Sequence, residues 1–277
     1  MQLKKGDTVA LVGNSNPQTK PAEVEQLVYL LQAMGLDVQT SPLLFDTATT
    51  NTKAKATVLQ DYFENPHIQA IFDISGGDRA NSILPYLDYA KIAKHPTPFF
   101  GYSDLTTVLN SLLVVQSTEL FQLKTLLWDE SGQQRQKFYE TFFKQQTSLY
   151  DVAWEFVQGN DIEGLVVGGN IRCLLKLSGT PYLPDLRDKV LFLESFGGGK
   201  DAIFSMLHHL VQLPHFEQVN GILLGTFTSY QKEEIYPIEQ LIKDVLPVEL
   251  PIAKTTQIGH GKDSHALSLG KVIQLRA

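Results

Sequence analysis

The segment Phe99–Thr106 reads FFGYSDLT and joins an apolar strand to the start of a helix. Gly101 ends the apolar run, and Ser103 and Asp104 stand where the helix predicted over 105–116 begins. A sharp strand-to-helix turn lifts the Ser103 hydroxyl out of the sheet, beside free backbone N–H groups that favour negative charge. From these residues alone two interpretations stay open, a nucleophilic serine or an ordinary helix cap.

Apolar runs alternate with amphipathic stretches on both sides of this segment. Pro21 opens a helical pattern, and the Asn65-Pro66 pair ends another. Strands are predicted at 7–13, 36–40, 68–75 and 97–102, with helices between them at 21–34, 52–64 and 81–87. Strand–helix–strand alternation of this kind predicts a mostly parallel, flavodoxin-like sheet with helices on both faces.

The second half of the chain changes in character. Residues 131–148 are rich in Gln, Lys, Phe and Glu and predict a surface helix that leads into a linker. Strand-like runs follow at 164–169, 189–194, 221–227, 252–258 and 270–275. The fold class predicted is therefore α/β, with an N-terminal domain at 1–148 and a strand-rich C-terminal α/β domain at 149–277.

Composition excludes several classes of protein. The 277 residues are 43% apolar and 19% charged, with a net charge of −7 and no cluster of Lys and Arg, so nucleic acid is not an expected partner. Cys173 is the only cysteine, which rules out an intrachain disulfide framework and a CxxC site. No run approaches the roughly 18–20 apolar residues of a membrane span, and no secretory signal is evident. We expect a soluble, cytoplasmic protein with no membrane partner.

A nucleophilic serine needs a base, and the base needs an orienting partner. Of the seven histidines, His260 is the best placed, because it follows a strand and lies between two glycines. Glu194 closes the apolar run 190–194, where a charge is costly unless it is paired. Asp73 and Asp104 are rival carboxylates, and a plain turn histidine and an exposed strand-end carboxylate remain the alternatives.

A glycine pair, Gly76-Gly77, follows the strand predicted at 68–75. Its backbone N–H would complete an oxyanion hole with the N–H of Asp104, although glycine pairs also make ordinary tight turns. Both segments fall at the carboxyl ends of parallel strands, where ligands bind in open α/β sheets. No HExxH motif, complete phosphate loop or dinucleotide fingerprint is present, so neither a metal nor a cofactor is expected.

The motifs together resemble the LD-carboxypeptidase family of serine peptidases, which also includes the microcin C immunity peptidases. The motifs follow the family's order at 9–12, 75–88, 101–106, 167–170, 179–185, 191–194 and 258–260. The resemblance implies a Ser–Glu–His triad of Ser103, Glu194 and His260 on two domains, with backbone oxyanion donors at Gly77 and Asp104. It also implies a homodimer, no metal, and a small peptide or peptidyl-nucleotide substrate.

The chain departs from the family pattern near this site. Ser75 precedes the glycine pair where Arg is usual, and 123–125 lack the usual Gly-Pro after the elbow helix. Ser195 and Gly197 replace two acidic residues after Glu194. The stretch 81–89 looks closer to the microcin-immunity branch, in which a tryptophan stacks on the nucleotide base.

Two further residues are candidates for contact with substrate. Trp154 is the candidate counterpart of the base-stacking tryptophan, with a buried core residue as the alternative, and Gly76 is a candidate substrate contact.

These features predict a serine peptidase in which Ser103 attacks a carbonyl, His260 carries the proton and Glu194 fixes the imidazole tautomer. The substrate would be a murein tetrapeptide that loses its terminal D-Ala, or a peptidyl or aminoacyl nucleotide of the microcin type. The altered residues motivate a second hypothesis, a non-catalytic binding protein on the same scaffold. A metal-dependent hydrolase is a third.

Overall fold

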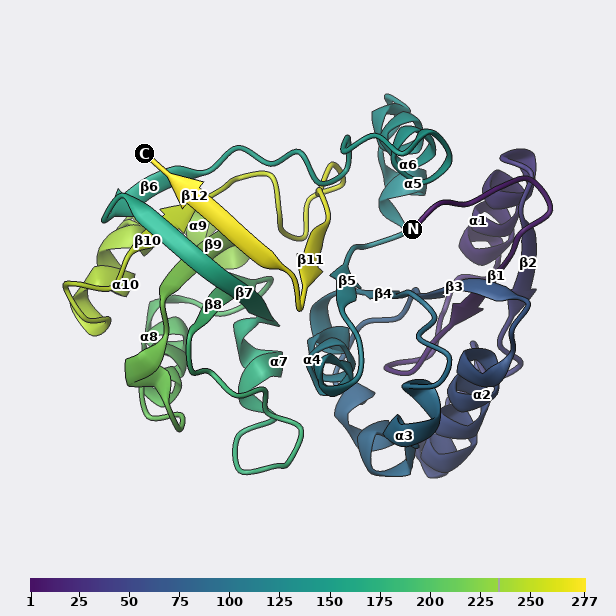
Figure 1. The fold of residues 1–277 in the computed structure, drawn as a ribbon, viewed down its shortest axis with the longest axis horizontal. Coiled ribbons are helices and arrows are strands. Elements are labelled where there is room, and N and C mark those ends of the chain that lie inside the picture. Colours follow the sequence, from purple (N-terminus) through teal and green to yellow (C-terminus); the bar gives the residue numbers. More distant parts are fainter. Residues whose placement is uncertain (234) are drawn as a thin grey trace.

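The computed structural model describes residues 1–233 and 235–277, which form two six-stranded sheets flanked by helices (Figure 1). The α/β class is confirmed, as is the mostly parallel first sheet. The strands of each sheet come mainly from one half of the chain. A site built from both halves of the chain must therefore lie where the two halves meet.

The first sheet has the order β2-β1-β3-β4-β5-β11. Its first five strands run parallel, and β11 pairs antiparallel with β5 at one edge. The strands are β1 (Thr8–Val12), β2 (Asp37–Thr40), β3 (Ile68–Asp73), β4 (Phe99–Gly101), β5 (Thr118–Leu120) and β11 (Leu267–Leu269). Parallel strands place all their carboxyl ends at one side of the sheet, so the turns after β1, β3 and β4 meet there.

Helices cover both faces of this sheet because its strands are apolar on both sides. Ile71 and Phe99 pack into the core on one face, and the adjacent Phe72 and Phe100 into the core on the other, as the period of two requires. One face is covered by α2 (Thr52–Glu64), α3 (Tyr89–Ile92), α4 (Thr106–Ser111) and the 3-10 helix η2 (Ala80–Tyr86), and the other by α1 (Pro21–Ala33), α5 (Thr125–Trp128) and α6 (Gln133–Lys144).

Helix α6 differs from the surface helix predicted over 131–148. Its Phe138 and Phe142 are buried and pack edge to face, with ring centroids 4.8 Å apart. Residues four apart lie on one helix face. This apolar face therefore closes the core over Phe72 and Phe100, and only the opposite face of α6 is polar surface.

The second sheet has the order β12-β7-β8-β9-β10-β6. Its four inner strands are parallel, and its two edge strands are antiparallel. The strands are β6 (Glu155–Gln158), β7 (Asp161–Asn170), β8 (Lys189–Ser195), β9 (Gly221–Phe227), β10 (Ile252–Lys254) and β12 (Val272–Arg276). The helices are α7 (Ile171–Leu175), α8 (Lys200–Leu210), α9 (Thr228–Glu233) and α10 (Ile238–Val245).

The two sheets share one hydrophobic core, which joins the halves of the molecule. Val108 and Leu109 of α4 lie in the same cluster as Val166 of β7 and Phe192 of β8. The Asn110 side chain hydrogen-bonds both the N–H and the C=O of Gly168, at 2.9 and 2.8 Å. Helix α4 is thus fixed against the second sheet, and its N-terminal turn lies beside the carboxyl end of β7, where Thr106 Oγ1 accepts from the N–H of Asn170 (Figure 1).

Three short strands, β5, β6 and β11, were not predicted. Strand β11 comes from the C-terminal part of the chain but pairs with β5 of the first sheet, so the chain returns to that sheet before ending in β12. The boundary between 148 and 149 stays a prediction.

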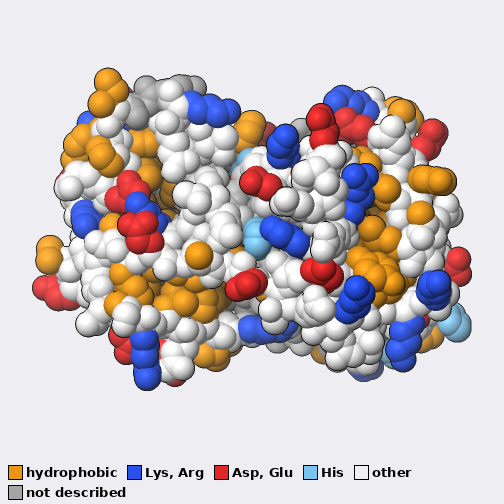
Figure 2. Space-filling view, turned by 90° about the horizontal axis from the view of Figure 1, so that it is seen from above, with side chains coloured by type: hydrophobic (Ala, Val, Ile, Leu, Met, Phe, Trp, Pro, Cys, Tyr) orange, Lys and Arg blue, Asp and Glu red, His pale blue; other side chains and the backbone are white. Residues whose placement is uncertain are grey.

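The outer surface carries mixed charge. On the face drawn in Figure 2, acidic and basic side chains are interspersed over two lobes separated by a waist. Within the described residues, no helix is long and apolar enough to cross a membrane.

Candidate active site

Ser103 lies in a strained turn between β4 and the helical segment that leads into α4. Its φ is +57°, in the left-handed region that non-glycine residues seldom adopt. Tyr102 before it is extended, and residues 103–105 form one turn of 3-10 helix. This is the strand-to-helix turn that the sequence predicted, and such strain is retained where the surrounding structure enforces it, as at functional sites.

Glu194 and His260 are brought together from distant parts of the chain. Glu194 ends the apolar run of β8 and is completely buried. Its Oε2 lies 2.8 Å from Nδ1 of His260, and its Oε1 accepts a hydrogen bond of 2.9 Å from Nδ2 of Asn170. The His260 contact is close but not aligned as a hydrogen bond. The buried carboxylate therefore has the neighbours that its burial demands.

The imidazole of His260 is held between two aromatic rings. Tyr102 meets it edge to face with centroids 5.0 Å apart, and Phe196 lies at 4.8 Å on a tilted plane. A Cβ at Gly259 would lie 1.7 Å from Oγ1 of Thr226, so only glycine lets this backbone approach β9. Burial, together with the charge of Glu194, raises the pKa of Tyr102 well above its usual range. Tyr102 is therefore a neutral packing surface for the imidazole.

Ser103 and His260 line one cavity of about 240 Å³. The His260 side chain is 11% exposed, and its Nε2 has no hydrogen-bond partner among the described residues. A serine and a histidine with an unpaired ring nitrogen thus line the same cavity, as general-base catalysis requires, and the contact between such groups is often loose before substrate binds.

One residue of the glycine pair lines this cavity. Gly76 lines it, and Gly77 has a φ of +130°. A Cβ at Gly77 would lie 2.2 Å from Cγ of Asn16, whose side chain accepts a hydrogen bond from the N–H of Asp78. The segment is therefore a tight, glycine-dependent turn that borders the serine cavity.

The carboxylate of Asp104 points away from the Ser103 cavity. It is buried and accepts hydrogen bonds from Ser15 Oγ at 2.6 Å and from the N–H of Ala80 at 2.8 Å. Nζ of Lys176, from the segment after α7, lies 2.5 Å from its other oxygen. This ion pair ties the serine turn to the C-terminal half of the chain.

Asp73, the other rival carboxylate, ends β3 beneath the cavity. It is buried and accepts four hydrogen bonds, two each from Asn14 and Ser75. Burial raises its pKa, and these hydrogen bonds oppose the rise. Its role is to hold two turns together.

The remaining candidates do not join the cavity. Trp154 is partly buried against the shared core. His265 is buried and contacts Nζ of Lys137 at 2.7 Å. The five other histidines are exposed, namely His67, His95, His208, His209 and His215.

Sequence reasoning assigned no role to three residues of the site. Trp128 and Lys124 line the cavity from the segment after β5, a strand too short to be recognised. Asn170 ends β7 and caps α7, accepting from the N–H of Cys173. Asn170 stands in a motif, 167–170, that is recognisable in the sequence. The contact between Asn170 and Glu194, however, depends on the register of β7 with β8.

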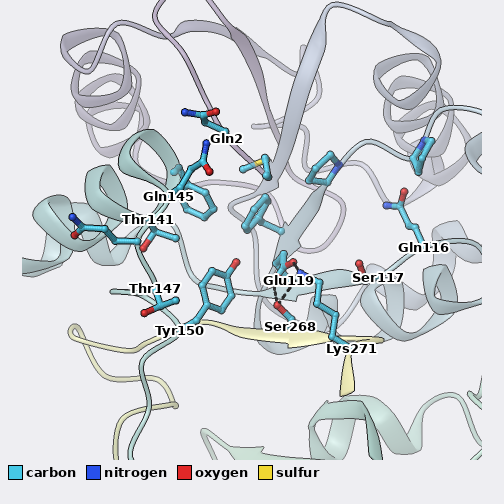
Figure 3. A pocket seen from close by; sticks show the side chains of 16 residues that line it. Gln2, Gln116, Ser117, Glu119, Thr141, Gln145, Thr147, Tyr150, Ser268 and Lys271 are labelled. Atoms are coloured by element: carbon cyan, nitrogen blue, oxygen red, sulfur yellow. Dashed lines mark hydrogen bonds and ion pairs between the residues drawn. The ribbon is translucent and has the colours of Figure 1, made fainter. Parts of the chain in front are cut away.

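A larger cavity lies elsewhere. About 760 Å³ in volume, it lies between β5, β11 and α6 (Figure 3). There Glu119 contacts Ser268 Oγ at 2.6 Å and Lys271 Nζ at 3.0 Å. Neither Ser103 nor His260 lines it, so we place the chemistry in the smaller cavity.

In the part of the chain that the structure describes, no three His, Cys, Asp or Glu side chains gather in a way that would hold a metal ion.

Comparison with known protein families gives two matches in sequence order. Residues 9–121 match the LD-carboxypeptidase N-terminal domain, and residues 163–275 match the LD-carboxypeptidase C-terminal domain. The chain belongs to the LD-carboxypeptidase family. It is accordingly a peptidase of the serine carboxypeptidase class, which confirms the resemblance and the enzyme class predicted from the sequence. The hypothesis of a binding protein without activity loses its support.

Individual relatives cover nearly the whole chain. A probable murein peptide carboxypeptidase of Bacillus subtilis is 27% identical, over 97% of this chain and 88% of its own length. The microcin C7 self-immunity protein MccF of Escherichia coli is 25% identical, over 97% and 90%.

Solved structures have the same fold. MccF in its wild-type apo state superposes with a TM-score of 0.86 at 22% identity, covering 100% of this chain and 97% of that one. A muramoyltetrapeptide carboxypeptidase from Oxalobacter formigenes gives 0.81 at 20% identity, covering 98% and 95%.

Proposed function

We propose that the chain hydrolyses the peptide bond before the terminal D-Ala of a murein tetrapeptide, with Ser103, His260 and Glu194 as its triad. One observation carries the proposal. Glu194 and His260 form a buried pair 2.8 Å apart, and His260, whose Nε2 has no partner among the described residues, lines the same cavity as Ser103.

The proposed reaction has two stages, acylation and deacylation of Ser103. Nε2 of His260 takes the proton of Ser103 as Oγ attacks the carbonyl carbon of the residue before D-Ala. Backbone N–H groups of Gly77 and Asp104 hold the oxyanion. His260 then protonates the leaving amine of D-Ala, and water, activated by the same imidazole, hydrolyses the acyl-enzyme.

Glu194 orients the imidazole, and Asn170 orients Glu194. The amide of Asn170 occupies Oε1 at 2.9 Å, which leaves Oε2 for the Nδ1–H of His260. A small rotation of the ring aligns this bond when substrate enters. The carboxylate then stabilises the imidazolium that forms in the transition state.

The size of the cavity favours a small leaving group. Pockets for drug-sized ligands are typically about 300–1,000 Å³. The cavity at Ser103 is about 240 Å³, which suits one terminal amino acid better than a whole nucleotide.

A second candidate substrate is a peptidyl or aminoacyl nucleotide, and two aromatic side chains favour it. Trp128 lines the cavity, and Phe196 is 57% exposed beside His260. Exposed aromatic faces stack on nucleobases. Solved complexes of MccF, a protein of the same fold, contain aspartyl sulfamoyl adenosine and glutamyl sulfamoyl guanosine. For this substrate Trp154, which the sequence predicted to stack on the base, is the alternative to Trp128 and Phe196.

A side-by-side assay separates the two. Purified protein is incubated with murein tetrapeptide and with an aspartyl-adenylate analogue, and products are measured by mass spectrometry. We expect release of D-Ala, abolished in Ser103→Ala with folding retained. Cleavage of the nucleotide conjugate alone would assign the second substrate, and activity of Ser103→Ala near wild type would remove the serine from the mechanism.

Assembly and location remain proposals from the family resemblance. We expect a homodimer, to be measured by analytical ultracentrifugation, and a cytoplasmic protein, to be checked by cell fractionation.

A further inference from the structure

A carboxypeptidase acts on substrates that end in a free carboxylate, and a cation in the cavity would recognise that charge. Among the described residues that line the cavity with Ser103 and His260, Lys124 is the only lysine or arginine. It stands in the segment 123–125, at the start of α5.

Lys124 is held in place by an uncharged partner. It is half-buried at the start of α5, and its Nζ donates to Oε1 of Gln18 at 2.5 Å. Gln18 is itself buried, with its Nε2 3.3 Å from the carbonyl oxygen of Ile74. An ammonium carries three N–H donors, so this contact leaves two for a ligand.

The ammonium has no carboxylate at ion-pair distance among residues 1–233 and 235–277. Burial lowers the pKa of Lys124, and the more distant charges of Glu23 and Asp73 oppose this shift. A partly desolvated cation with an amide partner is stabilised by an incoming anion.

The other titratable groups that face the cavity do not compete for this role. Asp73 is committed to four hydrogen bonds from Asn14 and Ser75. Tyr102 is buried against His260, and His260 itself contacts Glu194.

We propose that Lys124 binds the terminal carboxylate of the substrate and so selects peptides with a free C-terminus. The proposal rests on the proposed function, because it places the leaving residue between Lys124 and Ser103. Lys124 is then a specificity residue that binds substrate without taking part in proton transfer.

The test measures binding without turnover. Ser103→Ala protein is titrated calorimetrically with murein tetrapeptide and with the same peptide carrying a C-terminal amide. We expect the acid to bind about 10- to 100-fold more tightly than the amide, the range for a hydrogen bond to a charged group. Adding Lys124→Met should remove this preference, and Lys124→Arg should retain most of it.

Lys91→Met is the matched control. It removes the same charge from an exposed side chain that pairs with Glu64 outside the cavity, and it should keep the preference. Equal affinity for acid and amide in Ser103→Ala protein, including no binding of either, would overturn the proposal. So would a preference that persists with Lys124→Met.

Turnover of the tetrapeptide by protein with Ser103 intact is measured separately. A preference for the acid that depends on Lys124, without any hydrolysis of the tetrapeptide, would refute the proposed function and leave the Lys124 assignment standing. Hydrolysis of the tetrapeptide, together with a preference for the acid that does not depend on Lys124, would refute the Lys124 assignment and leave the proposed function standing.

Discussion

Nδ1 of His260 lies 2.8 Å from Oε2 of Glu194, a carboxylate that is completely buried at the end of β8. A charge in that position is costly unless its neighbours compensate for the lost solvent. Asn170 and His260 do so from two other segments. In the proposed mechanism, this arrangement stabilises the positive imidazole that forms when the serine proton is transferred.

Glu194→Gln tests this pairing. The amide keeps the size of the side chain but removes the charge and allows the wrong imidazole tautomer. We expect kcat to fall about 10³- to 10⁴-fold with KM little changed. Steady-state kinetics on the tetrapeptide measure this, and a loss below tenfold would show that the carboxylate does not assist the base.

Gly77→Ala tests the glycine-dependent turn at the cavity. The added methyl would meet the Asn16 side chain at a backbone angle that disfavours Cβ. We expect urea unfolding to show a loss of about 1–3 kcal/mol. Gly76→Ala is the matched control for stability, because nothing lies within 4 Å of the point where its methyl group would stand, and its loss should be smaller. Equal losses would contradict the strain assigned to this turn.

Asp104→Asn tests the ion pair that ties the serine turn to the C-terminal half. Asp104 is 0% exposed and Lys176 is 20% exposed, so removing the negative charge leaves a largely buried ammonium whose other carboxylate partner, the exposed Asp78, is 3.4 Å away. We expect a loss of about 3 kcal/mol in the free energy of unfolding. Arg172→Gln, which breaks an exposed pair with Asp78, should cost about 1 kcal/mol or less. A loss for Asp104→Asn no larger than for Arg172→Gln would refute the link.

His265 predicts an acid-sensitive stability. Burial, and then the charge of Lys137, lower its pKa in the folded protein. The unfolded chain therefore takes up this proton first, at a pKa of about 6.5. The contribution of His265 to the free energy of unfolding should therefore be constant above that pH. It should fall as the pH drops below that value.

His265→Gln should flatten that fall, measured by urea titrations between pH 7 and 5. The same change at the exposed His67 is the control. An unchanged pH dependence in His265→Gln would exclude this histidine as the cause.

Much of the fold could be predicted from local patterns. The helix predicted at 52–64 is α2 to the residue, because a proline ends it and its apolar spacing is regular. Strands β5 and β11 were not predicted, because each has only three residues and so shows no periodicity. Their pairing also joins segments about 150 residues apart. The burial of α6 was missed because Phe138 and Phe142 stand among charged residues.

The residues of the candidate site also fall into two groups, those that a local pattern predicts and those that depend on the assembled sheets. Ser103, Glu194 and His260 each lie in a local context that a single sequence displays, and the resemblance joined them. The roles proposed for Asn170 and Lys124 depend on strand register and on which residues line one cavity. Those are properties of the assembled sheets, which no short motif records.

The most direct test of the central claim is the reaction of the protein with a fluorophosphonate, followed by peptide mass spectrometry. If the imidazole of His260, oriented by Glu194, activates Ser103, the adduct forms on Ser103 and is lost in His260→Ala. An intact protein that takes no label, or labelling of Ser103 that is as fast without His260, would contradict the triad.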